Sequence, residues 1–142
     1  MILYRLAKIS DTLELRKLND SFNGEGCNTL KAIEESLKYN KQEIVYVAAA
    51  ENMLVGYCCG QILKSMCYSY NYGEITELYV REEYRQQGIG RQLMMRIESE
   101  FRRHGVNHLH LLTDRNNSIA QALYRSCGFN DTSEILFEKN FV

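Results

Sequence analysis

The chain has 142 residues, of which 45% are hydrophobic and 25% are charged. This composition is typical of one globular domain, so we expect residues 1–142 to form a single domain. The 17 Lys and Arg residues and 18 Asp and Glu residues give a formal charge of -1, which argues against non-specific nucleic-acid binding. No apolar stretch approaches the roughly 20 residues of a membrane span. Arg5 and Lys8 interrupt the N-terminal apolar residues, so we expect no signal peptide and no membrane partner.

The cysteines and histidines show no metal-binding spacing. The five cysteines are odd in number, include the adjacent pair Cys58 and Cys59, and form no C-x-x-C motif. We therefore expect reduced cysteines and a cytoplasmic location. His108 and His110 would share one face of a strand, but no Cys or carboxylate stands at ligand spacing around them. We expect no bound metal.

Periodicity predicts the elements of the first half of the chain. Alternation of apolar and polar residues is typical of strands, and recurrence every three or four residues is typical of helices. Ser10 precedes a helical pattern as an N-cap would, and Glu51 and Asn52 separate two strand patterns as a hairpin turn would. In chain order we predict a strand over 2–7, a helix after Ser10, a helix over Asn28–Tyr39, strands over Glu43–Ala50 and Met53–Leu63, and a strand over Glu74–Val80.

The strongest helical pattern begins after Gly88. Ile89, Leu93, Ile97 and Phe101 recur every four residues, and Gly105 follows as a stop signal. We further predict a strand over Val106–Thr113, a helix over Asn117–Cys127 and a last strand over Ile135–Lys139. This order of elements predicts an α/β or α+β fold, with a mixed sheet and helices packed on its faces.

The segment Arg85–Gly90 joins a strand to this helix and suits an anion. Gly88 and Gly90 let an anion approach free N–H groups at the positive end of a helix. Residues 81–105 carry six Arg and four Glu, a local balance of +2 that favours an anionic ligand. A dinucleotide motif would need Gly or Ala where Leu93 stands, and a P-loop would need Gly-Lys-Ser/Thr. Taken alone, the pattern fits an ordinary turn equally well.

A second motif accompanies the glycine turn. Residues Asn117–Phe129 match Asn-x-x-Ala-x-x-Leu-Tyr-x-x-x-Gly-Phe at every fixed position, starting 27 residues after Gly90. With both motifs the sequence resembles the GNAT superfamily of acetyl-CoA-dependent N-acetyltransferases, in which Arg/Gln-x-x-Gly-x-Gly/Ala lies between the fourth strand and a long helix. The resemblance covers residues 43–140 well and the first 42 weakly, and Glu82 stands where many members have proline. It implies a single-domain, mixed but mostly antiparallel sheet with helices on both faces.

The resemblance also implies where acetyl-CoA binds. Its pyrophosphate would lie on the main-chain amides of the glycine turn, between two guanidinium groups. The main chain of the preceding strand would pair with the pantetheine arm, much as a sheet edge pairs with a strand. The implied residues are Arg85, Gln86, Gln87, Gly88, Ile89, Gly90 and Arg91 in the turn, Leu78, Tyr79 and Val80 in the strand, and Asn117 and Tyr124 at the thioester end.

Acetyl transfer from a thioester to an amine needs a base for the amine and an acid for the leaving thiolate. Tyr124 holds the family's position for the acid, and a phenol with an ordinary pKa of about 10 suits a thiolate. For the base we choose Glu77 over Glu74; in a regular strand the two would point to opposite faces because their spacing is odd. Action through water, or a merely solvated carboxylate, fits each glutamate as well.

The resemblance and the acidic residues predict transfer to the primary amine of a small cationic molecule, a polyamine or an aminoglycoside. Glu25, Glu34 and Glu35 would form an acidic entrance for it. Three alternating tyrosines at positions 68–72 form either a binding wall or, as we prefer, an ordinary strand face. A protein N-terminal or lysine acetyltransferase and a catalytically idle acyl-CoA-binding regulatory module are the alternatives. The oligomeric state stays open, with a homodimer as one option.

Overall fold

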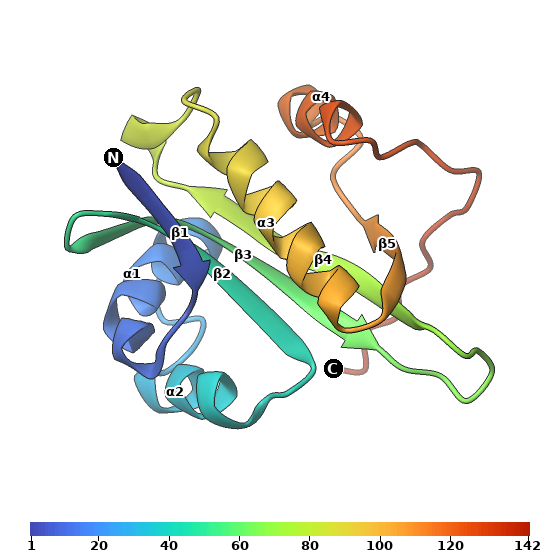
Figure 1. The fold of residues 1–142 in the computed structure, drawn as a ribbon, viewed down its shortest axis with the longest axis horizontal. Coiled ribbons are helices and arrows are strands. Elements are labelled where there is room, and N and C mark those ends of the chain that lie inside the picture. Colours follow the sequence, from blue (N-terminus) through green and yellow to red (C-terminus); the bar gives the residue numbers. More distant parts are fainter. The chain divides into compact units, whose positions relative to one another are not determined.

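The computed structural model describes all 142 residues, and its contacts group them into two compact units, Met1–Leu112 and Thr113–Val142 (Figure 1). None of the helices combines the length and the hydropathy that a membrane crossing needs. The first unit contains the strands β1 (Ile2–Leu6), β2 (Glu43–Ala50), β3 (Met53–Leu63), β4 (Asn71–Val80) and β5 (Val106–Leu111), and the helices α1 (Thr12–Asn23), α2 (Leu30–Tyr39) and α3 (Ile89–Arg103). The second unit contains α4 (Ser118–Ser126).

The five strands form one sheet in the order β1-β2-β3-β4-β5. The first three pairings are antiparallel, and β4 and β5 are parallel. A parallel pair needs a crossover connection, and α3 supplies it between β4 and β5. Helices α1 and α2 lie on one face of the sheet and α3 lies on the other (Figure 1). The predicted mixed, mostly antiparallel sheet with helices on both faces is confirmed.

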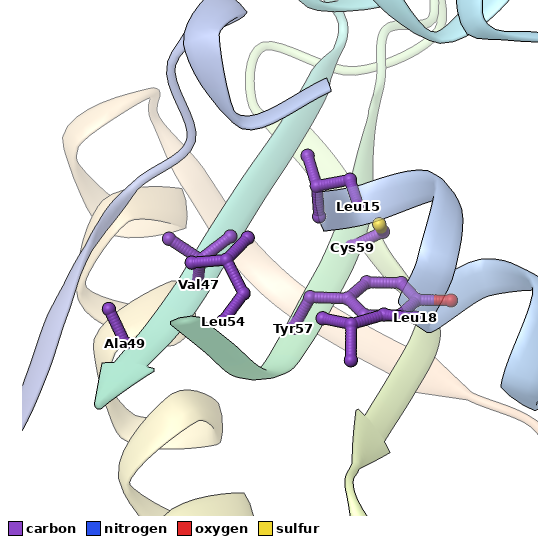
Figure 2. Close-up of a cluster of buried hydrophobic side chains, with 7 residues drawn as sticks. All are labelled: Leu15, Leu18, Val47, Ala49, Leu54, Tyr57 and Cys59. Atoms are coloured by element: carbon purple, nitrogen blue, oxygen red, sulfur yellow. The ribbon is translucent and has the colours of Figure 1, made fainter. Parts of the chain in front are cut away.

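The face under α1 carries a compact apolar cluster. Leu15 and Leu18 of α1 press onto side chains of β2 and β3, and full burial of each such side chain contributes about 1.5–3 kcal/mol. Figure 2 shows the whole cluster, which consists of Leu15, Leu18, Val47, Ala49, Leu54, Tyr57 and Cys59. This contact fixes α1 over the middle of the sheet.

Helix α3 packs on the other face through the predicted four-residue stripe. Ile89, Leu93, Ile97 and Phe101 are each at most 2% exposed, which confirms that prediction. Two glycines make room for the largest of these side chains. A Cβ atom added to Gly73 would lie 2.8 Å from Phe101 Cε1, and one added to Gly60 would overlap the same ring. Helix α3 can therefore approach the sheet closely at this point.

Two details of the predicted elements are wrong. Asp11, rather than Ser10, is the N-cap residue of α1, and its side chain makes no capping bond to that helix. Its carboxylate instead accepts a 2.7 Å hydrogen bond from the Lys8 N–H and two from the Arg5 guanidinium. Strand β4 begins at Asn71 rather than Glu74, because Asn71 already pairs with Val106 of β5 and Tyr72 with Leu63 of β3.

The predicted last strand over Ile135–Lys139 does not form. Within the unit Thr113–Val142 the only helix or strand is α4, so the segment has no strand partner there. Its apolar side chains remain exposed, with Ile135 72% and Phe137 84% accessible. An alternating sequence without a pairing partner does not make a sheet.

We expect Gly60→Ala to lower the free energy of unfolding by about 1–3 kcal/mol, the usual cost of overpacking a core. Phe101→Leu removes the ring that the new methyl group would meet. The double variant should then be more stable than the sum of the two single effects predicts. Urea unfolding of the four proteins measures this coupling, and strictly additive effects would show that Phe101 does not occupy the space over Gly60.

Candidate functional site

The turn before α3 presents free backbone N–H groups. Gln86 and Gly88 have positive φ angles of 61° and 81°, and Gly88 is the N-cap of α3. No side chain caps this end of the helix. The N–H groups of Ile89 and Gly90 therefore remain available at the positive end of the helix dipole, where anions bind well.

Beyond its middle, β4 has a partner on only one side. Its pairing with β5 ends at Ile75, which lies opposite Leu111. Residues 77–80 continue to pair with β3. The outer side of this half of β4 is therefore an open sheet edge.

Hydrogen bonds show which groups face that edge. The Arg81 N–H donates to the carbonyl of Val55 in β3 at 2.8 Å. Since backbone groups alternate along an antiparallel strand, those of Leu78 and Val80 point away from β3. Arg85 Nε donates to the Val80 carbonyl at 2.8 Å, which leaves the Val80 N–H and both groups of Leu78 on the open side.

An aromatic contact ties this strand to α1 and to the turn. The Tyr79 ring stacks on Phe22 at a centroid distance of 5.1 Å. The Arg85 guanidinium lies 5.6 Å from the centre of the same Tyr79 ring. The end of β4, the last turn of α1 and the glycine turn are thus held together by side chains.

A bulge in β4 turns two glutamates to the same face. Opposite β3, Glu74 pairs with Gln61 and Glu77 pairs with Cys59, so Thr76 is an extra residue in β4. Gln61 and Cys59 are two residues apart and share a face, and so do their partners. The prediction that Glu74 and Glu77 point to opposite faces is wrong, because it assumed a regular strand.

Cross-strand register aligns four polar residues in a row on this face. Glu43 pairs with Gln61, Gln61 with Glu74, and Glu74 with His110. Gln61 Nε2 donates to Glu43 Oε2 at 3.2 Å, and His110 Nε2 lies 3.6 Å from Glu74 Oε2. Sequence reasoning missed Glu43 and Gln61, since each is polar in a largely apolar strand and only the strand register joins them.

Glu43 is the carboxyl group that this environment perturbs. Burial raises its pKa, and the nearby charge of Glu77 raises it further. Ser36 of α2 donates to Glu43 Oε1 at 3.1 Å, which partly offsets the effect. Glu43 and Glu77 are therefore close enough for their charges to interact.

In the second unit, Asn117 and Tyr124 have local structural partners. The Asn117 side chain accepts a 3.1 Å hydrogen bond from the Ala120 N–H and caps α4. The Tyr124 ring meets Phe129 edge-on at 6.4 Å, and the Phe129 N–H donates to the Tyr124 carbonyl at 3.0 Å. These contacts explain several fixed positions of the motif as local structure.

The predicted acidic entrance has a balanced charge on α2. Glu34 and Glu35 are exposed there, but Lys31 and Lys38 are exposed on the same helix. Glu25 lies in the exposed loop before α2. The carboxylates of β2 and β4 therefore form a stronger case for a cation-binding face than those of α2 do.

The acetyltransferase (GNAT) family model matches residues 12–129, and the chain belongs to this family. It is 28% identical over 109 residues to an uncharacterized N-acetyltransferase of Chlorobaculum tepidum, covering 77% of this chain and 66% of that protein. It is 27% identical over 104 residues to the spermidine N(1)-acetyltransferase of Thermoplasma acidophilum, covering 70% of this chain and 61% of that protein. The chain thus spans less than two thirds of the length of these curated relatives.

A solved structure supports the fold at larger evolutionary distance. The aminoglycoside acetyltransferase from an uncultured soil metagenomic sample, solved in complex with trehalose, superimposes with a TM-score of 0.87. The alignment covers 99% of this chain and 96% of that chain, with 18% sequence identity. At this identity the likeness shows a common fold.

The raised pKa of Glu43 predicts a pH-dependent contribution to stability. Between its unfolded and folded pKa values the native state binds more protons than the unfolded state does, so stability falls as pH rises through that interval. Glu43→Gln removes this titration. We expect the variant to gain stability relative to the wild type from about pH 4 to neutral pH. Urea unfolding of both proteins across this range measures the difference, and a difference that does not change with pH would contradict the prediction.

Proposed function

We propose that the chain is an acetyl-CoA-dependent N-acetyltransferase that modifies the primary amine of a small cationic molecule, and that residues 1–142 act as one domain. The observation that carries this proposal is the open main-chain edge at Leu78–Val80 beside an uncapped helix N-terminus. Membership of the GNAT family supports the same reaction. An idle binding module could share the edge, so turnover decides between the two.

The open edge and the turn fit two chemically different parts of acetyl-CoA. The amide-containing pantetheine arm can pair with the free backbone groups of Leu78 and Val80 as an added strand. The pyrophosphate suits the amides of Gln86–Arg91, where the helix dipole favours an anion. Arg85 and Arg91 would add positive charge, and Arg85 is already anchored on Val80.

The reaction needs one group that accepts a proton from the acceptor amine and one group that donates a proton to the leaving thiolate. Glu77 accepts a proton from the acceptor amine, directly or through water, and the amine nitrogen then forms a bond to the thioester carbonyl carbon. The carbon–sulfur bond breaks, the Tyr124 hydroxyl donates a proton to the leaving thiolate, and the resulting phenolate takes the second excess proton from the nitrogen, which leaves a neutral amide. Asn117 lies seven residues, about two helical turns, before Tyr124 in the same motif and is proposed to line this end of the site.

Charge supports a cationic acceptor. Glu43, Glu74 and Glu77 are carried by one face of the sheet, which a positively charged amine would approach favourably. A relative is named as a spermidine N(1)-acetyltransferase and a structural neighbour as an aminoglycoside acetyltransferase, and both names refer to cationic amines. A polyamine or an aminoglycoside is therefore the acceptor class that we propose, ahead of a protein N-terminus or lysine.

Gly88→Ala should weaken acetyl-CoA binding at least about tenfold, because an added Cβ destabilises the positive φ that directs the turn amides toward the anion. Gly105→Ala is a matched control at the other end of α3, since Gly105 has a φ of 74° and its added Cβ would meet only Asn71 Nδ2, at 3.8 Å. Both variants should lose a similar amount of stability. Calorimetric titration with acetyl-CoA measures the affinities. Equal affinities in the two variants, or no binding by the wild type, would refute the proposed site.

Tyr124→Phe removes one hydroxyl and should lower turnover by ~10²–10⁴-fold, as expected for a lost general acid. The affinity for acetyl-CoA should change little, because the ring remains. Tyr39→Phe serves as the control, since Tyr39 is 71% exposed on α2. Thiol release with an amine acceptor measures the rates, and unchanged turnover in Tyr124→Phe would exclude the proposed acid.

A further inference from the structure

Three tyrosines at the start of β4 form one exposed cluster. The rings of Tyr68, Tyr70 and Tyr72 lie 5.3–5.6 Å apart between centroids, and Tyr72 lies 5.7 Å from His108. Tyr68 is 50% exposed and Tyr70 is 37% exposed. The exposed parts of these neighbouring rings form a surface that can bind a cation or the methylene chain beside it.

The hydroxyl groups of this cluster also gather. Hydrogen bonding between the Tyr72 hydroxyl and those of Tyr68 and Tyr70 raises the pKa of Tyr72 above its usual value. The Tyr72 phenol therefore stays uncharged at neutral pH, and the hydroxyl oxygens of the cluster can accept hydrogen bonds from an ammonium group. The cluster offers both ring faces and oxygen acceptors.

Strand register places this cluster in line with the proposed base. Tyr72 and Glu74 are two residues apart and share a face, and the bulge brings Glu77 to that face as well. Opposite them on β3 lie Leu63, Gln61 and Cys59, respectively. Measured along β3, where their partners are two and four residues apart, Glu74 lies about 7 Å from Glu77 and Tyr72 lies about 13 Å from it, at about 3.3 Å a residue.

We propose that Glu74 and the cluster of Tyr68, Tyr70 and Tyr72 bind the second, non-reacting ammonium groups of a linear polyamine whose terminal amine reacts beside Glu77. This proposal rests on the proposed function and narrows its acceptor class. The carboxylate of Glu74 accepts N–H bonds from an inner ammonium group, and the tyrosines hold the far end. Glu77, Glu74 and the tyrosine cluster form a narrow row along one strand, called the polyamine strip below. Such a row matches a linear chain better than a branched set of sugar rings.

The spacing predicts a dependence on acceptor length. Putrescine can reach from Glu77 to Glu74, whereas spermidine is long enough to contact the tyrosines also. His110 Nε2 lies 3.6 Å from Glu74 Oε2. The tyrosine cluster should therefore raise the affinity for spermidine over that for putrescine, whereas Glu74 should contribute to the affinity for both.

The test is calorimetric titration of the full chain with spermidine and with putrescine, each in the presence of saturating CoA. Tyr72→Leu should weaken spermidine binding about tenfold and putrescine binding much less, while Glu74→Gln should weaken both. Tyr39→Leu, which alters an exposed tyrosine outside the strip, is the matched control and should leave both affinities unchanged. Tyr72→Phe separates the ring, which it keeps, from the hydroxyl.

A parallel assay of acetyl transfer keeps the two proposals distinguishable. Transfer by the wild type with equal effects of Tyr72→Leu on both amines, or with none, would overturn the polyamine strip and leave the acetyltransferase proposal intact. Strip-dependent binding of spermidine without any acetyl transfer would overturn the proposed function and leave the binding site standing. Absence of spermidine binding by the wild type at millimolar concentration would overturn the strip whatever the transfer assay shows.

Discussion

The extra residue Thr76 in β4 is the constraint on which the candidate site depends. In a regular strand Glu77 would point to the face opposite Glu74, where α3 packs. The bulge instead turns both carboxylates toward the face that also carries Glu43. Pairing with β5 ends one residue before the bulge, at Ile75, so the outer main chain of β4 is open from there on. One inserted residue thus places a carboxylate and a free sheet edge side by side.

The core on the opposite face positions the other half of the site. Phe101 occupies the space over Gly60 and Gly73, and the buried stripe of α3 continues from there to Ile89 at the beginning of the helix. The glycine turn follows directly, with Gly88 as the helix cap. Its amides are therefore oriented by packing before any ligand binds, which lowers the entropic cost of binding an anion.

The sequence predicts features that depend on local spacing and misses those that depend on pairing. The apolar stripe Ile89–Phe101 and the glycine turn can be predicted from the sequence alone, because neighbouring residues determine a helix and its N-terminus. The bulge at Thr76 can be recognised only from the pairing of β4 with β3. The faces to which Glu74 and Glu77 point were therefore predicted wrongly. The absent strand over 135–139 has the same origin, since alternation cannot show whether a partner strand is present.

Hydrogen exchange of individual backbone amides, measured by NMR with and without acetyl-CoA, tests most directly whether the open edge of β4 binds the cosubstrate. The amides of Leu78 and Val80 point away from β3 and should gain protection on binding, together with the amides of residues 88–91. The Tyr79 amide, which alternation directs toward β3, should change little. Saturating acetyl-CoA that binds without protecting Leu78 and Val80 would contradict the proposed binding mode.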